Sequence, residues 1–234
     1  MNDSRSRILG RIRSSLQVNQ AHLQSQADDF PAPHPRGPFV ATDLPVLEQF
    51  EAELTALHGH VHICDGPADA LEQIGSLLEA AGAQRVMAWD SDKLPIPGLD
   101  SLLGSMGIDC VDPQVLSADD RRARLDALEP IAVGLTGAQA AVAESGSMLV
   151  LSDNGRGRLA SLLPPMHIAV IPADRIVQTL PDAFALLKRE HGDELFSEHS
   201  NLAVISGPSR TADIELSLTL GVHGPKEVHV IVVR

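Results

Sequence analysis

Side chains able to carry chemistry are concentrated in three polar stretches, each of which adjoins an apolar run. The stretches read TGAQAAVAESGS (136–147), SDNGRGRLASLLPP (152–165) and SGPSRTADIELSLTLGVHGP (206–225). Their carboxylates, hydroxyls, arginines and histidine are groups that bind anions or transfer protons. We therefore look for a functional site in these stretches first.

In the first stretch, Thr136 is placed to cap a short helix over 137–143, its hydroxyl accepting an otherwise unpaired backbone N–H. Glu144 follows at the junction where Gly146 lets the chain turn into the next strand. A carboxylate held at a rigid sheet edge is a common position for a catalytic group. The alternative is a solvent-facing glutamate at a helix end.

In the second stretch, Asp153-Asn154-Gly155 is a turn signature, and Arg156 and Arg158 follow it. Arg158 has the planar donor geometry that binds a carboxylate or a phosphate with two hydrogen bonds. The alternative is an exposed loop arginine without a ligand.

The third stretch is predicted to start a helix over 211–220, capped by Ser209 or Thr211, with Asp213 and Glu215 in its first turn. Free N–H groups at such a helix start bind anions, but acidic residues in the first turn already satisfy the helix dipole. Residues two apart on a helix diverge, so these two carboxylates do not form an obvious acid–base pair.

Histidines give two further candidates. His223, before Gly224-Pro225, is predicted to return to the same sheet edge with an imidazole that titrates near neutrality. His58, His60 and His62 alternate and would share one face of a strand. No Asp or Glu lies between them, which favours a structural role and leaves metal binding open.

The elements that must position these groups alternate between strand-like and helix-like segments. Strands are expected over 61–64, 85–89, 108–111, 131–136, 147–152, 167–172, 202–206 and 227–233. Helices are expected over 43–57, 67–81, 117–128, 175–190 and 211–220. Several strands are continuous Val/Ile/Ala runs, which is typical of a sheet covered by helices on both faces. Segments 147–152 and 167–172 have no clear helix between them, which predicts an antiparallel pair and a mixed sheet.

The N-terminal part has a different pattern. Ile8, Leu9, Ile12 and Leu16 recur at helical spacing, which predicts a short amphipathic helix over 3–18. A run with four prolines (30–38) then reads as a linker, so residues 1–39 are expected to precede a domain over 40–234.

Composition excludes several classes. The chain of 234 residues has 31 acidic and 18 basic residues, a formal charge of −13, which argues against general nucleic-acid binding. No apolar run approaches the roughly 18 residues of a membrane span, and no signal-peptide core is evident, so we expect a cytoplasmic protein. Cys64 and Cys110 cannot supply the thiolates of a typical iron–sulfur cluster.

Taken in this order, the three stretches closely resemble the lactate-utilisation protein C family, whose shared unit is the LUD domain. The resemblance covers about residues 130–234, and the earlier part resembles the family only in layout. It is carried by Thr136-Gly137, Ala143-Glu144-Ser145-Gly146-Ser147, Arg158, Ser161-Leu162-Leu163-Pro164, His167, the segment 206–215 and the segment 221–225.

This resemblance implies an α/β fold similar to the NagB/RpiA/CoA-transferase group, a Rossmann-like three-layer α/β/α sandwich with a mixed sheet plus a short N-terminal helix. It implies that residues 40–234 are a LUD domain. It also implies a role in bacterial oxidation of L-lactate to pyruvate alongside two iron–sulfur proteins. This chain would then hold neither cofactor nor metal, with the clusters in its partners. Homo-oligomerisation stays open.

Two functions follow, and they leave open whether the chain is an enzyme. The first is a non-redox subunit that binds a small carboxylate or supports assembly of the cluster proteins. The alternative is an acyl/CoA transferase or hydrolase with Glu144 as nucleophile, because CoA transferases of similar fold use a Glu-x-Gly glutamate and Glu144-Ser145-Gly146 is similar. A structural role for all three stretches, with Arg158 paired to Asp213 and Glu215, is the third possibility.

The site expected from these arguments combines all three stretches in one cleft. Its catalytic candidates are Glu144 and His223. Its substrate-binding candidates are Thr136, Ser145, Gly146, Ser147, Arg158, Gly207, Ser209, Arg210, Thr211, Asp213 and Glu215.

Overall fold

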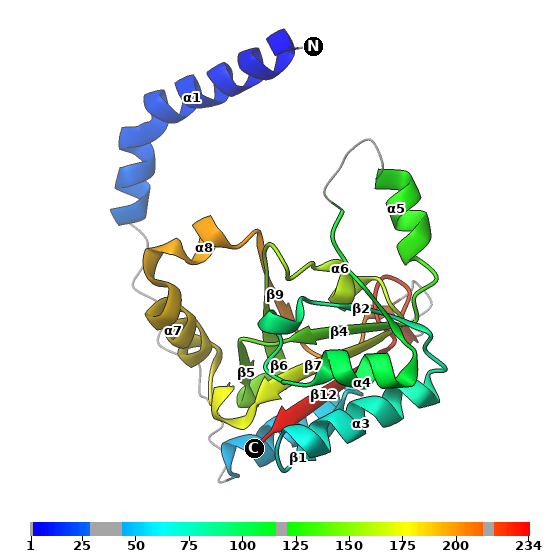
Figure 1. Ribbon diagram of the computed structural model, residues 1–234. Helices are drawn as coiled ribbons and strands as arrows, with labels where there is room; N and C mark the ends of the chain where they lie inside the picture. The colour runs from blue at the N-terminus through cyan, green and yellow to red at the C-terminus, as the bar shows by residue number, and fades with distance from the viewer. Residues whose placement is uncertain (1, 29–43, 116–120, 213–217) are drawn as a thin grey trace. The chain divides into compact units, whose positions relative to one another are not determined.

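The computed structural model of the chain describes residues 2–28, 44–115, 121–212 and 218–234 (Figure 1). The chain separates into two compact units, Met1–Thr42 and Asp43–Arg234. The first unit contains helix α1 (Asn2–Asp28). The helix predicted over 3–18 is therefore confirmed and extends further, and its apolar residues Ile8 and Ile12 are exposed. The proline-rich segment 30–38 lies outside the described residues.

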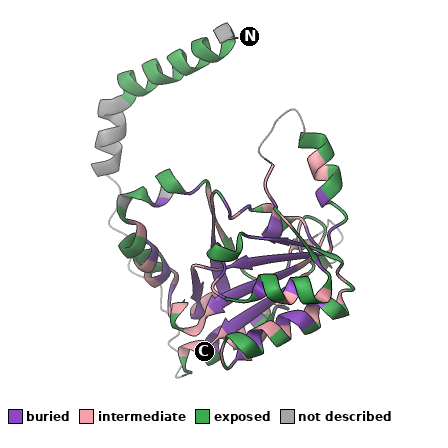
Figure 2. Ribbon diagram, in the orientation of Figure 1, coloured by how far each residue is buried: buried purple, intermediate pink, exposed green. Residues whose placement is uncertain are grey.

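The second unit is built around a six-stranded sheet in which every neighbouring pair is parallel. In spatial order its strands are β1 (His60–Cys64), β12 (Glu227–Val233), β7 (Met166–Pro172), β4 (Val133–Gly137), β2 (Arg85–Ala88) and β3 (Asp109–Val111). The inner strands are continuously apolar because both of their faces are covered. Figure 2 shows them as buried ribbons inside a more exposed shell of helices.

A second sheet carries the antiparallel pairs. It consists of β8 (Ile176–Val177), β5 (Ala140–Val142), β6 (Ser147–Ser152) and β9 (Asn201–Ile205). In it β6 pairs antiparallel with both β5 and β9, and β5 pairs parallel with β8. A separate hairpin is formed by β10 (Arg210–Ala212) and β11 (Leu218–Leu220).

Helices cover both faces of the parallel sheet. The helices of the second unit are α2 (Val46–Ala56), α3 (Pro67–Ala80), α4 (Leu99–Met106), α5 (Arg121–Leu128), α6 (Leu159–Leu162), α7 (Leu180–His191) and α8 (Leu195–Glu198). Of these, α7 packs against β5 of the four-stranded sheet and α8 packs against α7. Short 3₁₀ turns are η1 (Ser91–Lys93), η2 (Ala143–Ser145), η3 (Ala173–Arg175) and η4 (Gly192–Glu194).

The direction of the connections explains this two-sided cover. From β1 to β2 to β3 the chain moves one way across the sheet, and from β3 to β4 to β7 to β12 it moves back. Since crossovers are right-handed, the two directions place their connecting helices on opposite faces. Accordingly α3 and α4 pack on one face and α6 lies on the other (Figure 1). The predicted α/β class with a sheet between helices is confirmed.

All eight expected strands are confirmed. The helices expected over 43–57 and 67–81 are also confirmed, as α2 and α3. The helix expected over 117–128 is described from Arg121, as α5. The helix expected over 175–190 starts later, because η3 and β8 precede it and a capping box of Thr179 and Asp182 begins α7.

Three local predictions are wrong. The segment 137–143 is not a helix: Gly137 ends β4, and the fully buried β5 pairs with β6. Thr136 cannot cap a helix there, because it lies within β4. Burial of these small residues between sheet neighbours outweighs the helix propensity of alanine.

The predicted helix over 211–220 is also wrong at both described ends, where β10 and β11 pair through Thr211 and Thr219. Neither Ser209 nor Thr211 therefore caps a helix.

The third wrong prediction is the antiparallel pairing of 147–152 with 167–172. These segments are β6 and β7, and they belong to different sheets. The six-stranded sheet is consequently parallel throughout, and the predicted mixed sheet is the four-stranded one, in which β6 pairs antiparallel with β5 and β9 while β5 pairs parallel with β8.

Candidate functional site

A pocket of about 280 Å³ lies beyond the carboxyl end of one strand of the parallel sheet, β3. Parallel α/β sheets bind ligands at this edge because the strand-to-helix loops converge there. Its walls come from the segment after β3, from α5, from the loop between β6 and α6, and from the residue before β9. The lining residues are Pro113, Gln114, Val115, Arg121, Leu125, Ser152, Asp153, Arg156, Gly157, Arg158, Leu159 and Ser200.

The loop between β6 and α6 is fixed by its own turn and by the end of β2. Asp153 and Arg156 form an antiparallel bridge around an Asn-Gly turn, with Gly155 at φ 85°. The backbone N–H of Asp90, just after β2, donates to the carbonyl of Gly155 at 2.9 Å. A side chain at Gly155 would place its Cβ 2.5 Å from the Asp90 carboxylate, so glycine is required for this approach.

Two further contacts hold the pocket wall. The indole N–H of Trp89 donates to the carbonyl of Gly157 at 3.3 Å. The guanidinium of Arg156 lies 5.8 Å from the centre of the Trp89 ring, within cation–π range. Trp89 is 2% exposed and is the single tryptophan of the chain. Its fluorescence is therefore an internal reporter of this wall.

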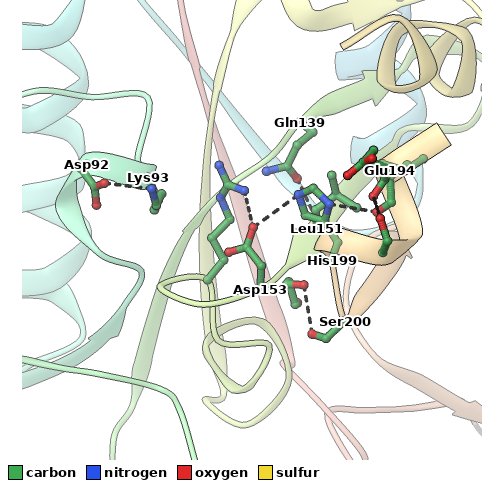
Figure 3. Close-up of polar contacts among 12 residues, drawn as sticks. Asp92, Lys93, Gln139, Leu151, Asp153, Glu194, His199 and Ser200 are labelled. Atoms are coloured by element: carbon green, nitrogen blue, oxygen red, sulfur yellow. Dashed lines mark hydrogen bonds and ion pairs between the residues drawn. The ribbon is translucent and has the colours of Figure 1, made fainter. Parts of the chain in front are cut away.

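A chain of polar side chains runs from this wall to the segment before β9 (Figure 3). Arg156 Nη1 donates to Asp153 Oδ2 at 2.7 Å, and His199 Nε2 lies 3.3 Å from the same oxygen. The other ring nitrogen of His199 lies 2.9 Å from the carbonyl of Leu195.

The pocket offers both charge and unused hydrogen-bonding capacity. Among the described residues no ion pair engages Arg121 or Arg158, whereas Arg156 is paired with Asp153. Asp153 Oδ1 and Arg156 Nε are buried without a hydrogen-bond partner in the described part of the chain. Buried polar atoms are normally satisfied, so these two, which lie inside the wall and are not exposed to the pocket, are exceptions. The arrangement suits a small anion, with hydroxyls of Ser152 and Ser200 on the same lining.

Of the predicted site residues, Arg158 lies in this pocket, and it precedes α6. Glu144 lies beyond the opposite end of β6. A six-residue strand separates the two, which corresponds to about 17 Å. Glu144 Oε1 accepts the backbone N–H of Leu180 at 2.8 Å, so its half-buried carboxylate stabilises the start of α7.

Three of the predicted or neighbouring hydroxyls form a separate cluster at the start of β6. Ser147 Oγ lies 2.9 Å from Ser145 Oγ and 2.6 Å from Ser206 Oγ. Gly146, at φ 56°, lets α2 approach: a Cβ there would lie 2.4 Å from the backbone N of Leu54. The first and third stretches therefore meet here, away from Arg158.

Thr136 makes a buried pair on the parallel sheet, its hydroxyl 2.8 Å from His167 Nε2. Both side chains are fully buried, and burial lowers the pKa of His167 to about 4. His167 is therefore neutral at pH 7. This pair is inside the core, so it is not accessible to a ligand in the pocket.

The remaining predicted residues lie around the hairpin near the starts of β7 and β12. Gly207, at φ 83°, is buried against the carbonyl of Leu57. The Ser209 N–H donates to the carbonyl of Pro225, and the Gly221 N–H donates to the carbonyl of Ser209.

The hairpin itself has a different character from its buried base. Arg210 is exposed, Thr211 is half-buried, and His223 is exposed in the segment after β11. Asp213 and Glu215 lie outside the described residues.

Sequence reasoning missed most of the pocket. It noted Arg156 and the Asp153 turn only as a loop, and it gave no role to Arg121 or His199. Asn154-Gly155 flanked by an acid and an arginine was the available signal. Nothing local could connect His199 to Asp153, because they meet through the pairing of β6 with β9.

The alternating histidines form their own cluster. His60 and His62 stack on His229 of β12, with ring centroids 4.7 and 5.3 Å apart, and His62 Nε2 lies 3.0 Å from His229 Nδ1. Burial and the neighbouring imidazoles lower the pKa of His229 to about 4. The hydrogen bond between His62 and His229 and the stacking of His60 on His229 agree with the structural role that the sequence favoured. His58 is not part of these contacts.

Fold and site together define an α/β protein with a cationic ligand pocket at the carboxyl edge of a parallel sheet. A model of the LUD-domain family matches residues 47–233, and the chain belongs to that family. Among the described helices, none combines the length and apolar composition that spanning a membrane requires.

Similar proteins agree with this assignment. Lactate utilization protein C of Shouchella clausii is 36% identical over 156 residues, which cover 67% of this chain and 65% of that relative. The protein of the same name from Halalkalibacterium halodurans is 35% identical over 178 residues, covering 75% and 74%. The crystal structure of a DUF162 family protein from Deinococcus radiodurans superposes with a TM-score of 0.58 at 26% identity, covering 81% of this chain and 96% of that chain.

Proposed function

We propose that this chain takes part in lactate utilisation by binding the carboxylate of lactate or pyruvate in the arginine pocket. The observation that carries the proposal is the pocket itself, in which Arg121 and Arg158 stand unpaired among the described residues. Guanidinium groups bind carboxylates with paired hydrogen bonds. A volume of about 280 Å³ suits a small ligand. The names of the relatives supply the metabolic context.

In this proposal the chain is a non-redox subunit that acts with two iron–sulfur proteins. Its two cysteines support this role, because Cys64 is on β1 and Cys110 is on β3, the two edge strands of the parallel sheet. Thiols at opposite edges cannot ligate one cluster. Electron transfer would then belong to the partners, while this chain presents the substrate or product carboxylate.

The position of Glu144 argues against the transferase hypothesis. A nucleophilic carboxylate must be free to attack an acyl group, whereas Glu144 caps α7 through Leu180 and lies apart from the arginine pocket.

The direct test is a fluorescence titration of Trp89 with L-lactate and pyruvate, checked by calorimetry. We expect saturable binding that weakens at least about tenfold in Arg158→Gln and in Arg121→Gln, the loss of about 1.4 kcal/mol typical of a charged hydrogen bond. Arg189→Gln is the matched control, since Arg189 is exposed on α7 and does not line the pocket.

Equal binding by Arg158→Gln and the wild-type protein, or no binding of either acid, would remove the basis of the proposal. Reconstitution with the two iron–sulfur proteins tests the subunit role separately. Lactate oxidation should slow with Arg158→Gln in place of the wild-type chain and should be unaffected by Arg189→Gln.

A further inference from the structure

A second group of potential ligands lies where two short helical segments end. His191 is the last residue of α7, Glu198 is the last residue of α8, and His199 follows directly. The turn η4 brings α8 back beside the end of α7. The rings of His191 and His199 are in T-shaped contact, with centroids 4.7 Å apart. We call these three side chains the His–Glu–His cluster.

The cluster has a composition that transition metals prefer. One ligand atom from each residue lies within 4.8 Å of the other two. Two imidazoles and a glutamate are an established ligand set for zinc, which leaves one position for water or another ligand. Exposed carboxylates also cluster without metal, but two imidazoles that converge with a carboxylate are a more specific pattern.

Closing the cluster around an ion needs only small movements. Zinc–nitrogen and zinc–oxygen bonds of about 2.1 Å put tetrahedral ligand atoms about 3.4 Å apart. The separations must therefore shrink by no more than about 1.4 Å. Glu198 is exposed and His191 is half-buried, so rotation of these side chains supplies that movement, while His199 is buried and stays fixed.

The surroundings of His199 are those of a metal-bound histidine. A ligating imidazole usually gives its second nitrogen to a carboxylate or a backbone carbonyl. His199 has both, Asp153 Oδ2 at 3.3 Å from Nε2 and the carbonyl of Leu195 at 2.9 Å from Nδ1 (Figure 3). An ion on Nδ1 would replace the contact with the Leu195 carbonyl, and Nε2 would keep Asp153 as its acceptor. The carboxyl end of α7, where His191 lies, also favours positive charge.

We propose that His191, Glu198 and His199 bind one divalent transition-metal ion, zinc by the chemistry of the ligands, with Asp153 orienting His199 as an outer-shell partner. Asp153 also lines the arginine pocket, so the ion would be linked to the pocket wall through one side chain. This site is independent of the proposed carboxylate binding, because it shares no ligand with Arg121 or Arg158.

The test uses the full chain after dialysis against a chelator. Zinc is titrated by calorimetry, and cobalt is titrated with detection of the visible absorption of its tetrahedral complex. We expect one ion per chain. Replacing a ligand, in His191→Gln or Glu198→Gln, should weaken binding by more than about 100-fold, and Asp153→Asn by about 10- to 100-fold. Glu198 is exposed, so its replacement leaves the fold intact.

Two matched controls use the same substitutions elsewhere. His60→Gln alters an exposed histidine of the other imidazole cluster, and Glu129→Gln alters an exposed glutamate outside both clusters. Both should bind zinc like the wild-type chain. The proposal is overturned if the wild-type chain binds no ion, if His191→Gln and Glu198→Gln bind normally, or if His60→Gln is the variant that loses binding.

Discussion

The buried pair of Thr136 and His167 makes the stability of this protein sensitive to acid in a way that one substitution can isolate. His167 is fully buried, its Nε2 lies 2.8 Å from the Thr136 hydroxyl, and its Nδ1 has no partner among the described residues. Burial lowers its pKa from 6.5 to about 4. In the unfolded chain the imidazole regains its ordinary pKa.

The direction of the effect follows from proton uptake. Between pH 6.5 and pH 4 the unfolded chain binds a proton at His167 that the folded chain does not, so stability falls as pH falls through this window. The contribution is fully present above pH 6.5. At about 1.4 kcal/mol per pH unit, acidification across the window costs about 3 kcal/mol at this residue.

The substitution His167→Gln keeps a side-chain amide for the Thr136 hydroxyl but does not titrate. Its stability at neutral pH is expected to be lower, because the shapes differ. Its loss of stability on acidification should be smaller than that of the wild-type protein by about 3 kcal/mol. Burial and the neighbouring imidazoles also lower the pKa of His229, so some acid sensitivity persists in the variant.

The measurement is urea denaturation at a series of pH values from above 6.5 to about 4. His223→Gln, at an exposed histidine, is the control and should follow the wild-type curve. If the wild-type protein and His167→Gln lose stability in parallel across this window, the histidine is not held neutral by burial and the reasoning fails.

Three further substitutions test two glycine positions and one helix cap. Gly134→Ala should destabilise by at least about 2 kcal/mol, because its Cβ would lie 1.8 Å from the carbonyl oxygen of Ala160 in α6. Gly104→Ala, in α4 with open space around it, should be neutral or stabilising by up to about 1 kcal/mol, and equal urea midpoints for the two variants would contradict the packing argument. Thr179→Ala should cost about 1 kcal/mol by removing the capping box with Asp182, whereas an unchanged thermal midpoint would show that the cap contributes nothing.

The sequence by itself determined those elements whose hydrophobic pattern fits only one type of secondary structure. The runs that form β6, β7 and β12 are continuous apolar segments bounded by turn residues, and such segments have few alternatives to a buried strand. The spacing of apolar residues likewise predicted α2 and α3. Arg158 was named as a binding candidate from its guanidinium geometry and from the family resemblance, and it lies in the pocket.

Tertiary structure decided the elements whose local preference is weak. The alanines of β5 suit a helix, but pairing with β6 and full burial make them a strand. Thr211 looked like a helix cap and instead pairs with Thr219 in a hairpin. In both cases contacts between segments outweigh an intrinsic preference of less than about 1 kcal/mol per residue.

The site depends even more on long-range pairing. Asp153 and His199 are 46 positions apart, and they meet because the antiparallel register of β6 and β9 sets Ser152 opposite Asn201. Arg158 and Glu144 are close in sequence, yet β6 separates them. The sequence therefore supplied the types of side chain that can bind anions or metals, whereas strand register, which no local pattern encodes, decided which of them lie together.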